Sequence, residues 1–316
     1  MKIATQVGVL WAAVLVATMP MLVKGQIFVA NYNDGGIYND NASGAGSLFA
    51  TNLPVQGPMG MAFDTAGNLY VANYANGVVE KYNSLGSGSG FITGLTSPVG
   101  LAFNTNGNLF VANSTEGFGN IEEFSSGGGS TPIMTFSNAA MNDPYGIVFH
   151  NGDLYVANAG SGVIEQFNSL GVGSLFTDMH SSADTNASPW GLAFDNNGNL
   201  WVADSATNQI DEYNSSGILV TQIANTNLNQ PSGLAFDSTG NLYVANFNTN
   251  TIVKFVGGVG AVFATNGVPG VFGGDISAVA TLVPEPSIQA LLAIGAMLAL
   301  VSSRLARCRH FRRAGS

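Results

Sequence analysis

The sequence contains little cysteine and little positive charge. Its 316 residues include a single cysteine, Cys308, so no disulfide can form within one chain. Between residues 26 and 283 the only basic residues are Lys81 and Lys254, against 18 acidic residues, which gives a net charge of −16. A region this acidic repels phosphate backbones, which argues against nucleic acid as a partner.

The same region is poor in the residues of common catalytic centres. It has two histidines, His150 and His180, and no cysteine, which argues against a zinc site or a cysteine–histidine nucleophile pair. Its apolar residues do not recur at helical spacing. A glycine-rich, weakly charged chain without helical periodicity is typical of an all-β globular body.

A short pattern recurs along this region. Its clearest copy reads Pro-Ser-Gly-Leu-Ala-Phe-Asp at residues 231–237 and Gly-Asn-Leu-Tyr-Val-Ala-Asn at residues 240–246, two apolar runs joined by a turn. The first run recurs at residues 58–64, 98–104, 144–150 and 189–195. The second run closes on Asn31, Asn73, Asn113, Asn158, Asp204 and Asn246. These closing residues lie 42, 40, 45, 46 and 42 positions apart, a period that accommodates four strands.

Two further apolar segments complete each period. A third strand such as residues 163–167 and a fourth such as residues 174–177 follow each closing residue. Four antiparallel strands per period predict an all-β, six-bladed β-propeller. The region starts on a second strand, so we expect a C-terminal strand, from residues 269–272 or 276–283, to complete the first blade and close the ring. Both segments fit the repeat imperfectly, which leaves a seventh or irregular blade as the alternative.

The repeated pattern Pro-x-Gly-Leu-Ala-Phe-Asp-x-x-Gly-Asn-Leu-Tyr-Val-Ala-Asn/Asp resembles the NHL repeat and the related gluconolactonase-like propellers. The resemblance covers residues 26–283 and implies the propeller fold. It implies no single activity, because this architecture hosts binding scaffolds, lactonases and lyases. A gluconolactonase-type enzyme would need a Glu and two or more unlike Asp or Asn ligands at the channel mouth. This sequence offers one Asp in a ring of Asn.

The first 25 residues differ in composition from the repeats. Lys2 precedes an apolar run at residues 7–23, and the small residue Gly25 permits cleavage before Gln26. We expect residues 1–25 to be a secretory signal peptide, with a buried N-terminal strand as the alternative.

Residues 284–316 form a separate C-terminal unit. Pro284, Glu285 and Pro286 precede an apolar segment at residues 288–301, which we expect to be a hydrophobic helix. An arginine cluster follows, made of Arg304, Arg307, Arg309, Arg312 and Arg313.

This order of Pro-Glu-Pro, apolar segment and arginine cluster resembles the PEP-CTERM sorting signal of Gram-negative bacteria. The resemblance implies an exosortase-type membrane enzyme as partner, transient anchoring in the inner membrane, removal of the tail and delivery to the cell surface or its matrix. The alternative is an ordinary membrane anchor, for which the segment is short.

The closing Asn and Asp residues are the first candidate site. The second strand runs antiparallel to the first, so they should form a ring near the channel mouth where each Pro-x-Gly begins. They could bind a metal such as Ca²⁺ or a polyol, or they could cap the loops that follow them. Repetition in every blade favours the caps, because a binding site needs unlike groups at unlike positions.

Two aromatic residues occupy the x of Pro-x-Gly at the same mouth. Tyr145 and Trp190 could stack on a sugar there, or could pack between blades. We predict no metal site and no catalytic residue. The candidate ligand-binding residues at the mouth are Asn73, Asn113, Tyr145, Asn158, Trp190, Asp204 and Asn246.

Acidic residues recur on the third strands. Neighbours on a strand point to opposite faces, so the doublets Glu122–Glu123 and Asp211–Glu212 cannot act as paired carboxylates. We interpret them, together with Glu80 and Glu165, as solvated or blade-edge charges. His150, which replaces an Asp or Asn in the turn after the first strand, is interpreted as a substituted turn residue.

These patterns predict an exported cell-surface propeller that binds a matrix glycan or protein and performs no chemistry. The alternative is a divalent-cation-dependent, lactonase-like hydrolase that uses the central channel. We favour the binding protein, because the ring of closing residues has one carboxylate.

Overall fold

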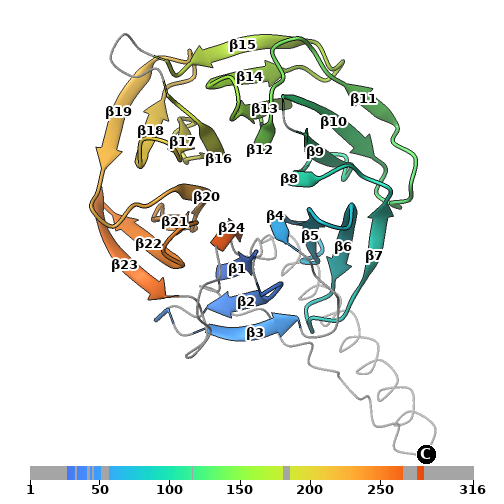
Figure 1. The fold of residues 1–316 in the computed structure, drawn as a ribbon, viewed down its shortest axis with the longest axis horizontal. Helices are drawn as coiled ribbons and strands as arrows, with labels where there is room; N and C mark the ends of the chain where they lie inside the picture. Colours follow the sequence, from blue (N-terminus) through green and yellow to red (C-terminus); the bar gives the residue numbers. More distant parts are fainter. Residues whose placement is uncertain are drawn as a thin grey trace, which may run out of the picture.

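The computed structural model describes residues 27–32, 34–40, 43–44, 46–50, 57–115, 117–180, 186–265 and 276–280. This part of the chain is a ring of six antiparallel sheets with four strands each (Figure 1). The predicted all-β, six-bladed β-propeller is therefore confirmed. No helix occurs among the described residues.

Each sheet is one blade, and its first strand lies nearest the axis (Figure 1). The first three blades comprise β24 (Ile276–Ala280), β1 (Ile27–Asn31), β2 (Ile37–Asp40) and β3 (Gly46–Ala50); β4 (Pro58–Phe63), β5 (Leu69–Asn73), β6 (Val78–Tyr82) and β7 (Gly88–Thr93); and β8 (Pro98–Phe103), β9 (Leu109–Thr115), β10 (Phe118–Phe124) and β11 (Met134–Phe136).

The other three blades are also consecutive in sequence. They comprise β12 (Pro144–His150), β13 (Asp153–Asn158), β14 (Val163–Phe167) and β15 (Gly173–Asp178); β16 (Pro189–Phe194), β17 (Leu200–Asp204), β18 (Gln209–Tyr213) and β19 (Leu219–Ala224); and β20 (Pro231–Phe236), β21 (Leu242–Asn246), β22 (Thr251–Val256) and β23 (Val259–Thr265).

The ring closes through the first blade. Strand β24 pairs antiparallel with β1, and it also contacts β20 and β4, the innermost strands of the two neighbouring blades. The prediction of a C-terminal closing strand is confirmed, and the segment at residues 276–283 supplies it. The other candidate, residues 269–272, lies outside the described residues.

The second strands form the centre of each blade, and their side chains are buried on both faces. All five residues of β5 and of β21 are buried, whereas β7 and β19 on the rim are largely exposed. Each hydrophobic cluster lies between two blades. For example, Tyr70 and Ile92 of the second blade pack with Leu101 and Leu109 of the third. The core is therefore a set of blade-to-blade layers around the axis.

The glycine of Pro-x-Gly lets the innermost strands approach one another closely. A Cβ atom added at Gly100 would lie 2.1 Å from the backbone oxygen of Tyr145, and one at Gly146 would lie 2.1 Å from that of Trp190. Gly60 faces Val99 at the same distance. These strands thus present their glycines to the backbone of the next blade, where any side chain would clash.

Both terminal units lie outside the described residues. The signal peptide at residues 1–25, the hydrophobic helix and the sorting signal of residues 284–316 therefore stay predictions. In the part of the chain that the structure describes, no helix has the length and hydrophobicity that crossing a bilayer requires.

Buried Asp40 gives the first testable prediction. Asp40 is 1% exposed, and burial raises the pKa of its carboxyl from 3.8 to about 6. The folded state therefore holds this proton more tightly than the unfolded chain, so stability is highest at low pH and falls as the pH rises from about 4 through about 6. We expect Asp40→Asn to remove this decline and to stabilise the protein above pH 6 by on the order of 2 kcal/mol.

Urea unfolding of wild type and Asp40→Asn at pH 4.5 and pH 7.5 measures this effect. An equal stability difference between the two proteins at both pH values would contradict the assignment, because the amide does not titrate.

Candidate functional site

The closing Asn and Asp residues lie where the repeat pattern places them along the strands. Five of them pair with the proline that starts the innermost strand of their blade, as in Pro98↔Asn113 and Pro189↔Asp204, and Asn31 pairs with Ile276, the first residue of β24. Their side chains point into the protein, and none is more than 4% exposed. The six are Asn31, Asn73, Asn113, Asn158, Asp204 and Asn246.

Four of these side chains accept hydrogen bonds from the backbone of neighbouring loops, among them Asn31 from the N–H of Asp34 at 3.4 Å. One carboxylate oxygen of Asp204 accepts hydrogen bonds from the backbone N–H groups of Ser188 at 3.0 Å and Ala206 at 3.2 Å. Asn246 accepts a hydrogen bond from the N–H of Asn229 at 3.0 Å, and Asn158 accepts one from the N–H of Asn142 at 3.3 Å. This is the bonding pattern of loop capping. A role for these residues in ligand binding stays a prediction.

The aromatic residues of the mouth are partly exposed and touch one another. The rings of Tyr145 and Trp190 stack with centroids 4.8 Å apart and an interplanar angle of 13°. The ring of Phe247 meets Trp190 edge-on at 5.5 Å and lies 6.3 Å from Tyr32, which in turn lies 6.4 Å from Tyr74. We call these five residues the aromatic mouth. They come from five of the six blades.

Only two members of the aromatic mouth were predicted from the sequence. Tyr32, Tyr74 and Phe247 were missed, although each directly follows a closing asparagine. That position lies one residue beyond the second strand and is a polar or small residue in the other three blades. An aromatic residue just after the strand end is therefore the signal that the repeat comparison could have used.

The hydroxyl group of Tyr145 can form hydrogen bonds at the mouth. Burial raises the pKa of Tyr145 to about 12, and the neighbouring groups of Tyr74, Asp143 and Tyr32 act in the same direction. Tyr145 therefore keeps its proton at neutral pH and can donate it in a hydrogen bond. Aromatic faces flanked by hydroxyl donors suit a ligand with both an apolar face and polar edges, such as a sugar ring.

The channel beneath the mouth is narrow. Its cavity of about 100 Å³ is lined by residues of the innermost strands, among them Met59, Val99, Ile147 and Leu192, and by the glycines of Pro-x-Gly. Small-molecule sites usually measure about 300 Å³ or more. The geometry therefore favours contact at the mouth over entry into the channel.

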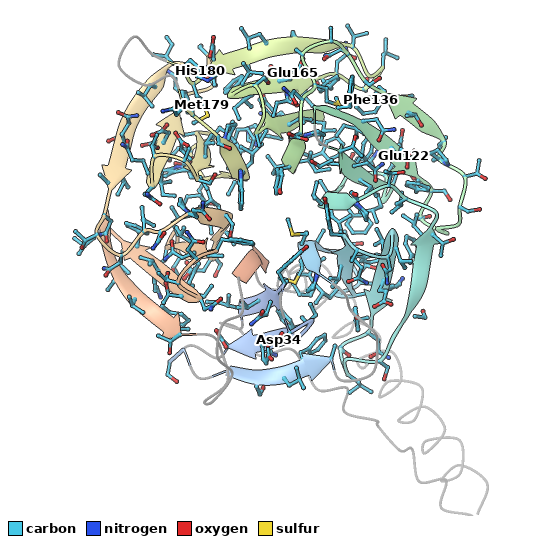
Figure 2. All side chains as sticks on the ribbon, viewed as in Figure 1. Asp34, Glu122, Phe136, Glu165, Met179 and His180 are labelled. Atoms are coloured by element: carbon cyan, nitrogen blue, oxygen red, sulfur yellow. The ribbon has the colours of Figure 1, made fainter. Side chains whose placement is uncertain are left out.

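The sequence predicted that the third-strand carboxylates are solvated or blade-edge charges, and this prediction was wrong for three of them. Glu80, Glu165 and Asp211 are buried, with 5%, 3% and 3% of their surface exposed. Glu165 lies inside the fourth blade (Figure 2), where its carboxylate accepts hydrogen bonds from the amides of Asn138 at 2.7 Å and Asn158 at 3.0 Å. Because strand alternation shows only that neighbours face opposite ways, it did not reveal which face was covered by the next blade.

Among the described residues, no group of three or more His, Cys, Asp or Glu side chains is arranged to hold a metal ion. His180 lies in a loop after β15, where its Nδ1 atom is 3.1 Å from the carboxylate of Asp178.

Six four-stranded blades around a central channel define the class of this chain as a six-bladed β-propeller. Two stretches, residues 186–211 and 228–255 in the fifth and sixth blades, match the family model of the NHL repeat. Together with the ring, these matches support an NHL-repeat β-propeller. No curated protein matches the chain by sequence.

Solved structures share the fold at low sequence identity. A chain of the nidogen/laminin complex is 18% identical with a TM-score of 0.66, covering 82% of this chain and 98% of that one. Virginiamycin B lyase from Staphylococcus aureus is 16% identical with a TM-score of 0.57, covering 76% and 80%. A streptogramin B lyase is 15% identical with a TM-score of 0.58, covering 76% and 79%. These similarities concern the fold.

Proposed function

We propose that this chain is an exported, non-catalytic propeller that binds a glycan or protein of the envelope or extracellular matrix through its aromatic mouth. The observation that carries this proposal is the convergence of five partly exposed aromatic rings from five blades at one end of the channel. Neighbouring aromatic side chains exposed at the mouth of a rigid ring form a ready contact surface for sugar rings and apolar side chains.

Delivery to that location rests on the two terminal units. The signal peptide at residues 1–25 would direct export, and the sorting signal at residues 284–316 would be read by an exosortase-type enzyme of the inner membrane. Loss of the tail would then release the propeller to the cell surface of a Gram-negative bacterium. The strong net negative charge of the repeat region suits a soluble exported protein.

The similar solved structures include both a protein that binds another protein and enzymes. The nidogen/laminin structure is a complex between two proteins, and the two lyases are enzymes. A lactonase-like hydrolase that uses a divalent cation in the channel is the enzymatic alternative for this chain. The aromatic mouth favours the binding role, because it supplies contact area and hydroxyl donors and includes no carboxylate, histidine or thiol.

Replacing Trp190 tests the proposal directly. We expect Trp190→Ala to weaken binding of the matrix glycan fraction at least tenfold, because truncating a central tryptophan removes its stacking surface. Trp201→Phe is the matched control, since Trp201 lies half-buried within the fifth blade and packs against Phe236 at 5.8 Å. Titration of the full chain by calorimetry against polysaccharides and protein from the matrix measures both variants.

The same preparation distinguishes the enzymatic alternative. Elemental analysis and a lactone hydrolysis screen would support the hydrolase if they found stoichiometric, tightly held calcium together with turnover. An unchanged affinity of Trp190→Ala for every matrix fraction that the wild type binds would contradict the role of the aromatic mouth.

A further inference from the structure

A second feature lies at the opposite end of the strands from the aromatic mouth. Strand β12, for example, begins at the mouth with Pro144 and ends on the other face with His150. On that face, five of the six junctions between blades gather an aromatic residue of the second strand and a phenylalanine from the next blade. In the junction after the second blade, Tyr70 contacts Phe91 at 4.9 Å and Phe103 at 4.8 Å.

Two of these junctions already hold an ammonium group from the chain itself. Lys81, which pairs with Tyr70 across the blade, places its Nζ atom 3.6 Å from the carboxylate of Asp64 and 5.1 Å from the centre of the Tyr70 ring. Lys254 does the same in the sixth blade, with Nζ 3.9 Å from Asp237 and 4.9 Å from Tyr243. The repeat therefore builds a cage of aromatic rings and a carboxylate that suits a cation.

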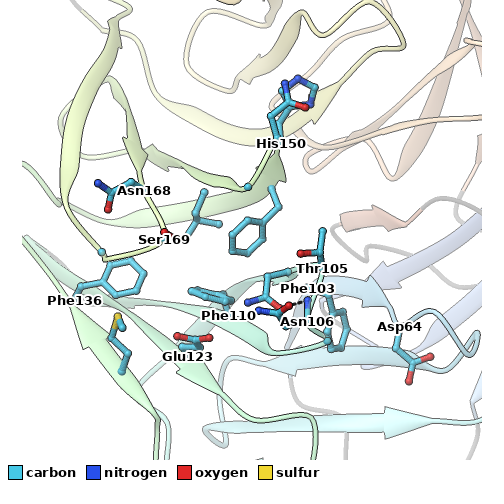
Figure 3. Close-up of a pocket in the computed structure, with 18 of the residues that line it drawn as sticks. Asp64, Phe103, Thr105, Asn106, Phe110, Glu123, Phe136, His150, Asn168 and Ser169 are labelled. Carbon is cyan, nitrogen blue, oxygen red and sulfur yellow. Dashed lines mark hydrogen bonds between the residues drawn. The ribbon is translucent and has the colours of Figure 1, made fainter.

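The third blade has the aromatic cage without the lysine. Phe110 takes the place of Tyr70, with Phe149 at 4.7 Å and Phe136 at 6.2 Å. The residue that pairs with Phe110 is Glu123, so a carboxylate stands at the position that a lysine occupies in the other two cages. This cage opens into a cavity of about 640 Å³ (Figure 3).

Local sequence changes account for the opening. Strand β11 has three residues, whereas the outer strand of the preceding blade, β7, has six, so the rim of the third blade is short. The turn after β12 is also tight, because Asn151 and Gly152 adopt positive φ values of 52° and 93°, as a two-residue hairpin requires. His150 stands at this turn in place of the usual Asp or Asn, and its ring stacks on Phe194 at 4.0 Å.

Glu123 remains available to a ligand. Its Oε1 atom accepts a hydrogen bond from the Asn108 amide at 2.7 Å, and within the described part of the chain no hydrogen bond reaches Oε2. The other charged or titratable groups lining the cavity are Asp64, which is paired with Lys81, and His150. Figure 3 shows Glu123 beside Phe110 and Phe136, with His150 at the far edge of the cavity.

We propose that this cavity, which we call the Glu123 pocket, binds an organic cation: a primary ammonium or guanidinium group. Glu123 supplies the opposite charge, and the phenylalanine rings supply cation–π contacts and apolar cover for the methylene groups of the ligand. In the second and sixth blades, Lys81 and Lys254 supply the ammonium group that aromatic rings and a carboxylate hold. The strong negative charge of the whole repeat region further attracts a cationic ligand.

The source of the cation is either a free amine or a basic side chain on a peptide. The full chain would be titrated by calorimetry with butylammonium, with acetyl-Gly-Lys-Gly-amide, with acetyl-Gly-Arg-Gly-amide and with the neutral acetyl-Gly-norleucine-Gly-amide. We expect binding of the cations and none of the norleucine peptide. Tighter binding of the peptides than of butylammonium would identify a protein partner, and equal binding would identify a free amine.

Glu123→Gln tests the role of the carboxylate. It keeps an oxygen that can accept the Asn108 hydrogen bond, and we expect it to lower the affinity for the cations at least tenfold. Glu212→Gln is the matched control, because Glu212 also accepts an asparagine amide, from Asn199 at 2.7 Å, but does not line the Glu123 pocket. Thermal melts of all proteins check folding.

The proposal would be overturned if the wild type bound no cation, if norleucine peptide bound equally well, or if Glu123→Gln and Glu212→Gln behaved alike. Trp190→Ala should leave cation binding unchanged, because the aromatic mouth lies at the other end of the strands. Failure of the proposed function at the mouth and failure of the Glu123 pocket are therefore distinguishable.

Discussion

Replacing Gly146 with alanine is expected to destabilise the propeller by about 3 kcal/mol, the upper end of the range for overpacked interiors. The added methyl group would lie 2.1 Å from the backbone oxygen of Trp190, and it would also meet the backbone of Gly191 and Leu192 at 3.2 Å. Backbone atoms of a paired strand cannot rotate away as the end of a flexible side chain can. The innermost strands of two blades would have to separate, which would also disturb the Tyr145–Trp190 stack.

Gly90→Ala is the matched control for this prediction. Gly90 lies on the outer strand β7, and a Cβ atom there would meet nothing within 4 Å. We expect this variant to remain within about 0.5 kcal/mol of wild type, as exposed substitutions usually do. Urea unfolding followed by tryptophan fluorescence measures both. Equal midpoints for the two variants would show that the close approach at Gly146 does not limit the ring.

A chain that ends at residue 275 is expected to lose the cooperative unfolding of a chain that ends at residue 283. The two differ by the segment that contains β24 (Ile276–Ala280), which pairs with β1 along Phe28, Val29 and Ala30. Without this strand the first blade loses its innermost member and its contacts with β20 and β4. The edge of β1 would then be unpaired, and an unpaired edge is a template for aggregation.

The effect of this truncation should exceed that of any single substitution, because a whole ladder of backbone hydrogen bonds and two blade contacts disappear together. Calorimetric melting and light scattering of the two purified chains measure it. If the shorter chain melted at the same temperature and stayed monomeric, strand β24 would not be what closes the ring.

The repeat itself explains why the fold was predictable from the sequence. Apolar residues equivalent to Leu242 and Val244 recur in every period, so the strand order inferred for one period applied to all the blades. The sequence offered two candidates for the closing strand, residues 269–272 and 276–283. Because neither matched the repeat well, the sequence could not decide between them. Pairing with β1 was needed to choose between them.

The candidate site was only partly predictable, because it depends on departures from the repeat. Tyr145 and Trp190 lie inside the pattern and were recognised, whereas Tyr32 and Phe247 lie one residue beyond it. Tyr32 and Tyr145 are far apart in sequence, and the curvature of the ring brings both into the aromatic mouth. The sequence periodicity placed the Pro-x-Gly positions at the channel mouth, but it did not show that the residue after each closing asparagine also converges there.

The Glu123 pocket was hidden for the same reason. On the sequence, Glu123 was one of several third-strand acidic residues, and Lys81 was one of two isolated basic residues. Their equivalence becomes visible when both are seen to pair with the aromatic residue of the neighbouring strand, Phe110 in one blade and Tyr70 in the other. The function of such a position depends on its cross-strand partner.

The way the ring closes also sets an order on its assembly. Five blades take all four strands from consecutive sequence, so each can form as soon as its own segment has been synthesised. The first blade needs residues 27–50 and residues 276–280 together, which lie at opposite ends of the repeat region. Its completion must therefore wait until nearly the whole chain has emerged, and every earlier intermediate is an open arc with two free ends.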